Sequence, residues 1–294
     1  MIDLISLLQN LSNGLLIGLV YALIGIGLTL IFSVMSTINF AHGDFVVLGM
    51  YIAVVFSQLL GWDPYLSLVV AIPFGFVLGV VIHRTILLRV INESQETSML
   101  VTLGISLVIA NILLLTVGSE PQSVYTSYAS DTFRVAGVNI SVVLLLAGIA
   151  TAVIAGVLYY VLHKTEPGRA IRATADNRLG AELIGIDTKR VQGMVMGIGC
   201  LLAIAAGVTL IPLLYATPTV TGPLFTLKAF VVVVLGGLGN VRATVAGGLL
   251  LGVVEVLGAA YLSSAYREAY GLFVFLLVLL LRPQGLFGRT VARV

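Results

Sequence analysis

Long apolar runs separated by short polar segments dominate the pattern of this chain. A run of about 20 apolar residues is long enough for an α-helix to cross the hydrocarbon of a bilayer. The pattern therefore predicts an all-α fold, a polytopic bundle of about eight or nine transmembrane helices. The predicted spans are 11–34, 41–61, 65–89, 98–118, 138–162, 193–215, 224–239, 243–262 and 269–282.

The seventh run, 224–239, differs from the others because it is short and ends in the sequence GGLGN. It falls below the roughly 20 residues of a full span, so a broken or re-entrant segment is an alternative to a complete crossing. The glycines resemble a phosphate-binding loop only superficially, because the Lys-Ser/Thr ending of such a loop is missing. We interpret them as a place of close helix packing or as a break in the backbone.

Composition supports the membrane interpretation. The chain has 294 residues, of which 59% are hydrophobic and 10% charged, with a mean hydropathy of +1.13. Soluble domains are about 25% charged. We therefore expect an integral membrane protein with one transmembrane domain over residues 1–294. Pairs of glycines four residues apart favour close contact between helices. They are Gly14 and Gly18, Gly75 and Gly79, Gly193 and Gly197, and Gly248 and Gly252.

The distribution of basic residues predicts the orientation, because Lys and Arg favour cytoplasmic loops. With nine crossings and 163–192 in the cytoplasm, twelve of the 15 basic residues fall on the cytoplasmic side. The N-terminus is then outside and the C-terminus inside, which favours a full crossing by 224–239. The twelve are Arg84, Arg89, Lys164, Arg169, Arg172, Arg178, Lys189, Arg190, Arg242, Arg282, Arg289 and Arg293, and the outer side keeps Arg134, Lys228 and Arg267. The outer loop 119–137 is either a landing surface for a partner or a plain solvated loop.

The segment 163–192 is the one long polar stretch with a definite pattern. Its apolar residues recur at every fourth position, which predicts a narrow apolar stripe on a short helix. Pro167 and Gly168 mark the start of this helix, and Gly185 is a candidate stop. Such a helix either lies on the lipid surface or docks into a groove of a soluble partner. The stripe consists of Ile171, Ala175, Leu179 and Leu183.

Polar residues also occur inside apolar sequence at the junction of the first two spans. Asn39, His42 and Asp44 lie there, and Gly43 allows the backbone to turn. Polar groups at membrane depth usually face protein or a water-filled cavity, which makes these three candidates for a functional site. The alternative is a structural turn in which Asp44 or Asn39 caps the second helix.

Glu255 is a lone carboxylate within a predicted span. It shares a helical face with Gly248, Gly252 and Ala259 and therefore points into the bundle. An intramembrane carboxylate is a candidate functional group. The alternative is that it hydrogen-bonds a neighbouring helix and fixes the packing, in a protonated form. No metal-spaced histidine pair and no nucleophile with a matching base occur, which argues against an enzyme.

Three stretches together resemble the permease subunits of branched-chain amino acid ABC transporters. They are NGLLIGLVYALIGIGLTLIFSVMSTINFAHGDFVVLGMY, GRAIRATADNRLGAELIGID, and GGLGN followed by LRPQGLFG. They occur in the family's order over nearly the whole chain, and INFAHG and RPQGLFG are specific signatures. Asp44 stands where a glutamate is common. The resemblance is to the shorter of the two permeases of such systems, and close relatives move urea or short amides.

The resemblance implies an importer in the bacterial inner membrane and several partners. These are a second, related permease, two ATP-binding cassette subunits that bind ATP and Mg²⁺, and a soluble substrate-binding protein. No cofactor is expected in this chain itself. A coupling helix within 168–185 would sit in a groove of an ATPase subunit, with Gly185 at its end. Ile171, Ala175, Leu179 and Leu183 would face the groove, and Arg169, Arg172, Asp176, Asn177, Arg178 and Glu182 would form its rim.

The sequence thus predicts a translocation pathway near Asn39, His42 and Asp44, with Glu255 as a weaker candidate. The pathway would lie between this chain and the second permease. A competing hypothesis is an ion-driven secondary transporter that uses Glu255 or Asp44 as its proton or sodium site. A third hypothesis is a passive channel that needs neither ATP nor a binding protein.

Overall fold

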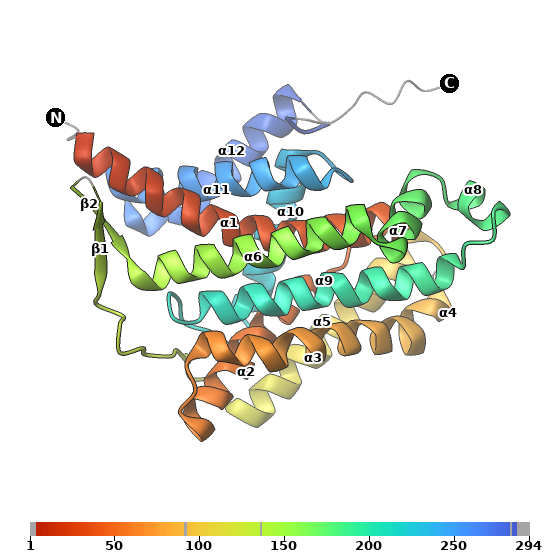
Figure 1. Cartoon of the computed structure of the whole chain (residues 1–294), viewed down its shortest axis with the longest axis horizontal. Helices are drawn as coiled ribbons and strands as arrows, with labels where there is room; N and C mark the ends of the chain where they lie inside the picture. The colour runs from red at the N-terminus through yellow and green to blue at the C-terminus, as the bar shows by residue number, and fades with distance from the viewer. Residues whose placement is uncertain (1–3, 91–92, 136, 283, 287–294) are drawn as a thin grey trace.

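The computed structural model describes residues 4–90, 93–135, 137–282 and 284–286. Arg289, Arg293 and three residues of the LRPQGLFG motif, Pro283, Phe287 and Gly288, lie outside these ranges. The described chain is a bundle of long helices, with a small hairpin at one end and two short helices at the other (Figure 1). The predicted polytopic helical bundle is thereby confirmed.

Among the described residues, eight helical segments are long and apolar enough to cross a membrane. Their bounds lie within a few residues of eight of the nine predicted runs. Two of them combine several helical elements: short 3₁₀ and π segments flank α3, and a 3₁₀ turn precedes α12. The segments are α1 (Leu4–Met35), α2 (His42–Leu60), Pro64–Val90 with α3 (Leu68–Ile82) and α4 (Leu88–Val90), α5 (Gln95–Val117), α6 (Val142–Lys164), α9 (Thr188–Leu210), α11 (Val241–Tyr261) and Ser264–Leu281 with α12 (Arg267–Leu281).

The doubtful seventh run forms α10 (Thr221–Gly236). Its 16 residues span about 24 Å at ~1.5 Å per residue, which is shorter than the roughly 30 Å of hydrocarbon. Its ends nevertheless belong to opposite ends of the bundle. Ala216, just before it, pairs with Gln122 of the loop after α5. Gly239, just after it, accepts a hydrogen bond from Ser33 near the end of α1.

The GGLGN sequence after α10 is a break in the backbone, as predicted. Gly237 and Gly239 have φ angles of 108° and 85°, values that glycine adopts without a steric penalty. The Asn240 side chain then accepts hydrogen bonds from the amides of Arg242 and Ala243 at 3.1 and 3.2 Å. Asn240 is therefore the N-cap of α11, and the segment needs no phosphate to explain its glycines.

The loop before α6 contains a hairpin that the helical pattern did not predict. β1 (Thr132–Val135) pairs antiparallel with β2 (Val138–Ser141). The predicted span 138–162 is therefore wrong at its start, because residues 138–141 form a strand and α6 begins at Val142. Short alternating segments such as VNIS are ambiguous between strand and helix until their pairing partner is known.

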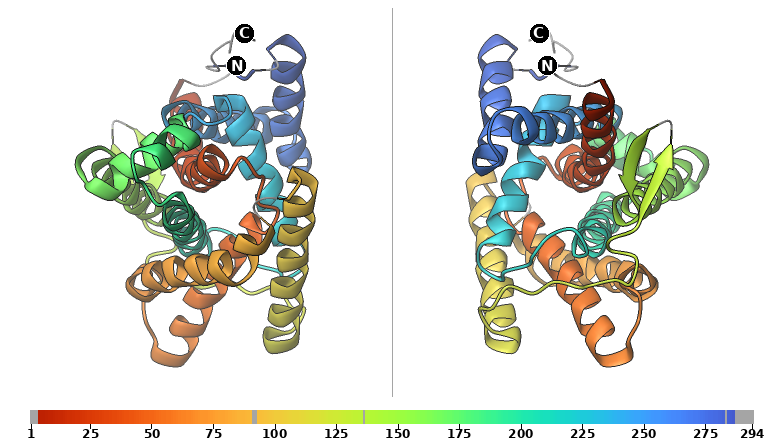
Figure 2. Two further views of the ribbon diagram at one scale, coloured as in Figure 1. Left: turned by 90° about the vertical axis from the view of Figure 1, so that its right-hand side faces the viewer. Right: turned by 90° about the vertical axis from the view of Figure 1, so that its left-hand side faces the viewer.

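The glycine pairs allow the close packing that their spacing predicts. A Cβ on Gly18 of α1 would lie 2.8 Å from the Cα of Leu249, and one on Gly252 of α11 would collide with the backbone of Gly14 and Gly18. The backbones of α1 and α11 therefore touch along this face. The helices α1, α9 and α10 lie at the centre of the bundle, whereas α5 and α12 stand at its edge (Figure 2).

Candidate functional site

The chain folds back into the bundle after α1. Ser36 has a φ of 53°, and the following residues lead back along α1 to the start of α2. His42 Nε2 lies 2.9 Å from the carbonyl oxygen of Ile24. Ile24 is about 16 Å from the end of α1, at ~1.5 Å per residue. The first turn of α2 therefore lies deep in the bundle, near the middle of α1.

The three polar residues predicted at this junction are all buried. Asn39 is 2% exposed, His42 is fully buried, and Asp44 is 1% exposed. Asn39 Oδ1 accepts a hydrogen bond from the amide of Ala41 at 3.1 Å, which holds the turn before α2. Asp44 lies inside the first turn and caps no helix, because Ala41 occupies the N-cap position. The interpretation of Asp44 as a cap is therefore wrong.

Gly43 lets the first turn of α2 touch the start of α10. A Cβ at this position would collide with the carbonyl oxygen of Gly222. The Gly43 amide donates a hydrogen bond to Thr226 Oγ1 at 2.9 Å, and this hydroxyl donates to the Phe40 carbonyl at 3.1 Å. Thr226 therefore joins α10 to both sides of the turn that carries His42.

Asp44 sits in this contact without a partner of its own. The Asp44 Oδ1 atom lies against Gly222, where any side chain would displace it. Neither carboxylate oxygen accepts a hydrogen bond from a described residue. The Ser106 hydroxyl of α5 and the backbone amide of Asp44 itself lie close enough to act on this carboxylate, but neither meets the distance and angle of a hydrogen bond. A buried carboxylate in this state is costly and is a candidate for a ligand contact.

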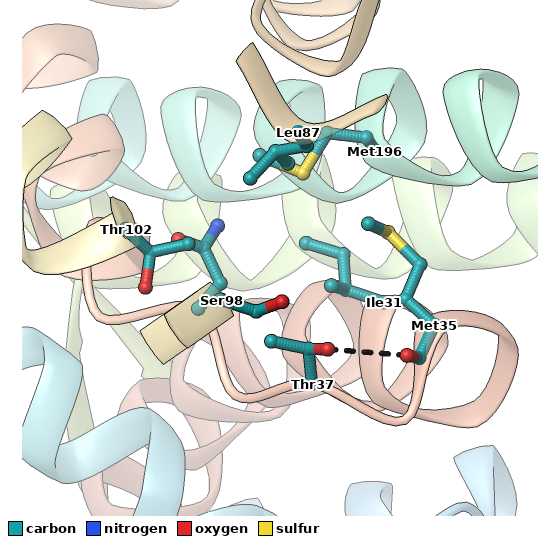
Figure 3. Close-up of a pocket in the computed structure, with 8 residues that line it drawn as sticks. Ile31, Met35, Thr37, Leu87, Ser98, Thr102 and Met196 are labelled. Carbon is teal, nitrogen blue, oxygen red and sulfur yellow. Dashed lines mark hydrogen bonds between the residues drawn. The ribbon is translucent and has the colours of Figure 1, made fainter. Parts of the chain in front are cut away.

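A very small cavity lies beside this junction, between residues of α1, the segment that follows it, α5 and α9 (Figure 3). Its volume is about 10 Å³, which is at the lower limit for one water molecule. Thr37 closes it by donating a hydrogen bond to the carbonyl of Met35 at 3.1 Å. Thr102 of α5 lines it and accepts a hydrogen bond from the amide of Phe40. The junction is therefore tightly packed on this side and leaves no room for a substrate.

Glu255 belongs to a separate buried network. Its Oε1 lies 2.5 Å from Nζ of Lys228 in α10, and its Oε2 accepts a hydrogen bond from the Tyr21 hydroxyl at 2.9 Å. The ammonium also lies 3.3 Å from Tyr21 Oη, and Arg267 Nε is 3.8 Å from Oε2. Glu255 is thus an ion-pair partner that ties α1, α10, α11 and α12 together. Lys228 lies inside α10, within the predicted span 224–239, and is 8% exposed.

The structure therefore separates the four predicted pathway residues into two sites. Asn39, His42 and Asp44 come together at the start of α2, and Glu255 lies in the ion network. α10 contributes to both, through Thr226 and Lys228. The sequence analysis missed these two residues, although a lysine in the apolar segment LFTLKAFVVVV, followed by a glutamate in the next span, signals a possible interhelical pair.

The segment 163–192 forms two helices, not the one predicted. α7 (Glu166–Asp176) begins after Thr165, whose hydroxyl accepts a hydrogen bond from the Gly168 amide. It ends at Asn177, whose side chain caps α8 (Arg178–Leu183) by accepting from the Gly180 amide at 2.9 Å. The single apolar stripe is therefore wrong, because Asn177 breaks the helix between its second and third members.

α7 is fixed to the bundle. Ile171 is 2% exposed and points into the chain's own core, so it does not face outward as the stripe predicted. Arg172 donates a hydrogen bond to the Leu162 carbonyl at the end of α6. A Cβ on Gly168 would collide with the carbonyls of Val161 and Leu162. Ala175 is half-buried, and Arg169 is exposed with an ion pair to Glu166 at 3.5 Å.

α8 lies at the end of the bundle opposite the hairpin (Figure 1). Leu179, Leu183 and Ile184 are 67%, 80% and 76% exposed. Gly185 ends the helix with a φ of 86°, and the Ile186 amide bonds the Ala181 carbonyl behind it, as in a Schellman cap. Asp176, Asn177, Arg178 and Glu182 are exposed around these side chains.

Glu182 holds α8 to the start of α9. Its Oε1 accepts hydrogen bonds from the Thr188 hydroxyl at 2.6 Å and from Arg178 Nε at 3.3 Å. The Thr188 hydroxyl, and after it Arg178, lower the pKa of this carboxyl below its ordinary value. The apolar tip of α8 is therefore carried on a segment with defined contacts at both ends.

Comparisons with known proteins place this geometry in context. The family model "Branched-chain amino acid transport system / permease component" matches residues 10–282. The chain is 32% identical to the high-affinity branched-chain amino acid transport permease LivH of Escherichia coli K12, over 96% of each chain. It is also 32% identical to BraD of Pseudomonas aeruginosa, over 96% of each chain.

More distant similarity extends to another permease and to one solved structure. The ribose import permease RbsC of E. coli is 26% identical over 93% of this chain and 85% of its own length. The structure of PsaBC from Streptococcus pneumoniae in complex with a Fab superimposes with a TM-score of 0.51, at 13% identity. It covers 94% of this chain and 92% of the PsaBC chain, which supports the fold alone.

Proposed function

Because this chain belongs to the branched-chain amino acid transport permease family, as its INFAHG and RPQGLFG motifs indicated, we propose that it is the membrane-spanning permease of an ATP-driven importer. The cargo is a branched-chain or another hydrophobic amino acid, and urea or a short amide is the alternative. The family is a family of transport permeases and not of enzymes. The protein spans the membrane several times, and we assign it to the bacterial cytoplasmic membrane.

The proposed complex contains a second permease, two ATP-binding cassette subunits and a soluble binding protein. The binding protein delivers substrate to the end of the bundle that carries the hairpin. ATP and Mg²⁺ are bound by the cassette subunits at the opposite, cytoplasmic end. Closure of the two cassettes moves the short helices at that end and changes which side of the membrane the pathway opens to.

The single observation that carries this proposal is the difference in burial between α7 and α8. α7 is buried against the end of α6 and transmits movement to the bundle as a rigid body. α8 holds Leu179, Leu183 and Ile184 more than two-thirds exposed, surrounded by charged side chains. An apolar centre with a polar rim is typical of a helix that docks in a groove of a partner protein. A helix lying on the lipid surface is the alternative for this segment.

The first experiment is a pull-down of the detergent-solubilised chain with its candidate cassette ATPases. Leu179→Asp and Leu183→Asp place a charge in the proposed contact without entering the core, so we expect ATPase retention to fall at least tenfold. Leu262→Asp is the matched control, because Leu262 is 76% exposed and follows α11 at the hairpin end.

Three outcomes decide the proposal. Loss of ATPase with both α8 variants, but not with Leu262→Asp, supports coupling through α8. Equal retention by wild type and α8 variants contradicts it. Uptake by the purified chain alone, without ATPases, supports an ion-driven carrier or a passive channel. A requirement for a proton gradient distinguishes the carrier, for which Asp44 is the candidate ion site because Glu255 is already paired.

A further inference from the structure

One cavity is lined by residues of α5 and α10, together with Leu28 of α1 and two residues of the segment that leads into α2. Its volume is about 310 Å³, at the low end of the roughly 300–1,000 Å³ of small-molecule sites. Leu103 lies on its α5 side, Phe230 on its α10 side, and Phe40 on the segment that leads into α2. The cavity is therefore the size of a small ligand and adjoins the buried junction.

The lining of this cavity is apolar except at two positions. Ser106 and Thr226 are its polar members, and the other seven side chains are aliphatic, aromatic or proline. The Thr226 hydroxyl already accepts from the Gly43 amide and donates to the Phe40 carbonyl. Ser106 is therefore the polar group in the wall with hydrogen-bonding capacity to offer a ligand.

Behind Ser106 lies the unpaired carboxylate of Asp44. It is 1% exposed, and neither oxygen has a hydrogen-bond partner among the described residues. A negative charge in this position attracts a cation strongly, because the surrounding protein screens charge poorly. The second buried carboxylate, that of Glu255, already has Lys228. The cavity therefore has an apolar wall with Ser106 as its available polar position, and the Asp44 carboxylate, which does not itself line the cavity, lies behind that position.

We propose that this cavity binds the transported amino acid, with its aliphatic side chain between Leu103 and Phe230 and its ammonium group at Ser106, facing Asp44. This assignment rests on the proposed transport function and adds the site, the orientation and the residue that sets the size limit. Leu103 is that residue. It is 43% exposed at the mouth of the cavity, so its volume can change without disturbing the core.

The test uses the complete transporter, with its partner permease, ATPases and binding protein, in proteoliposomes. Uptake of leucine and of valine is measured for wild type, Leu103→Trp and Leu103→Ala. The same binding protein is used throughout, so that its own preference cancels in the comparison. Because the two substrates differ by one methylene, we expect Leu103→Trp to lower the leucine-to-valine uptake ratio by about tenfold. Leu103→Ala is expected to raise this ratio.

Leu107→Trp is the matched control. Leu107 lies one turn further along α5, is 58% exposed, and is not in the cavity wall. We expect this variant to leave the ratio unchanged. Ser106→Ala should reduce uptake of both amino acids by the same factor, because it contacts the group that they share.

Failure of the cavity assignment is distinguishable from failure of the transport function. If Leu103→Trp and Leu103→Ala keep the wild-type ratio while transport and ATPase retention are normal, the assignment is overturned. The same holds if Leu107→Trp changes the ratio as much as Leu103→Trp, or if a lipid chain fills the cavity and uptake is indifferent to Leu103. If the wild-type complex takes up no amino acid, the proposed function itself has failed.

Discussion

The two intramembrane carboxylates of this protein are equally buried but differ in what surrounds them. Glu255 has an ammonium at 2.5 Å and a hydroxyl donor at 2.9 Å, from helices on both sides. Asp44 is surrounded by Gly222, by the backbone turn before α2 and by Ser106, whose hydroxyl is not at the distance and angle of a hydrogen bond. Glu255, which is isolated among apolar residues in the sequence, is paired in the structure. Asp44, which belongs to a polar cluster in the sequence, is unpaired.

This difference separates a charge that is compensated within the fold from a charge that is not. In a buried ion pair with additional hydrogen bonds, the two charges compensate each other, so no ligand is needed to stabilise them. A buried charge without a partner lowers stability unless something else compensates it. Burial alone therefore does not mark a carboxylate as a candidate for ligand binding in a membrane, and the number of its partners has to be counted as well.

The largest expected effect on stability comes from removing one partner of the Lys228–Glu255 ion pair. Lys228→Met leaves Glu255 buried without its nearest cation, so we expect a loss of about 3–5 kcal/mol in the free energy of unfolding. Unfolding of the detergent-solubilised protein by increasing denaturant, followed by intrinsic fluorescence, measures this change.

The double variant Lys228→Met, Glu255→Leu is the control for that measurement. Removing both charges removes the penalty as well, so most of the lost stability should return. A double variant as unstable as Lys228→Met alone would show that packing around Lys228, and not its charge, explains the loss.

A smaller effect of the opposite sign is expected at Asp44. Asp44→Asn keeps the shape of the side chain and removes a charge that has no partner. The free energy of unfolding should therefore stay the same or rise by about 1 kcal/mol, whereas uptake by the complete transporter should fall. Glu255→Gln, which leaves Lys228 unpaired, should lower stability under the same conditions. A clear loss of stability with Asp44→Asn would mean that the carboxylate has a structural partner.

The smallest effect is expected at Glu182, an exposed carboxylate on α8. Its pKa is lowered in the folded protein, by Thr188 first and by Arg178 second. Its stabilising contribution is therefore present above its unfolded pKa of about 4.3 and disappears as the pH falls through the folded pKa. We expect Glu182→Gln to increase amide hydrogen exchange in α8 slightly at pH 7 and not at all at pH 3. An equal increase at both pH values would contradict this titration.

The sequence is sufficient to predict most of the bundle, because each span is a local property of about 20 consecutive residues. The close packing of α1 against α11 was also predictable, since glycines spaced four residues apart lie on one helix face and favour helix contacts. The ends of the polar segment 163–192 were less certain. Asn177 is a good helix N-cap, but the regular spacing of Leu179 and Leu183 obscured the break that it causes.

The candidate site depends on contacts that no local pattern contains. Thr226 meets Gly43 across 183 residues of sequence, and Tyr21 meets Glu255 across 234. Asp44 is unpaired only because the start of α10 brings a glycine, not a donor, against it. The β1–β2 hairpin was not predicted for a similar reason, since a strand of four residues is defined by its pairing partner.

The contact between the start of α2 and α10 also constrains the order of events during biosynthesis. Ribosomes add about 5–20 residues per second. The chain between Gly43 and Thr226 therefore takes roughly 10–40 s to make, and until then Gly43 and Asp44 lack the helix that they contact. Lys228 waits only roughly 1–5 s for Glu255, 27 residues later. The ion pair can thus form as soon as α11 enters the bilayer. The Asp44 carboxylate, in contrast, must be solvated by water, lipid headgroups or the insertion machinery for most of translation.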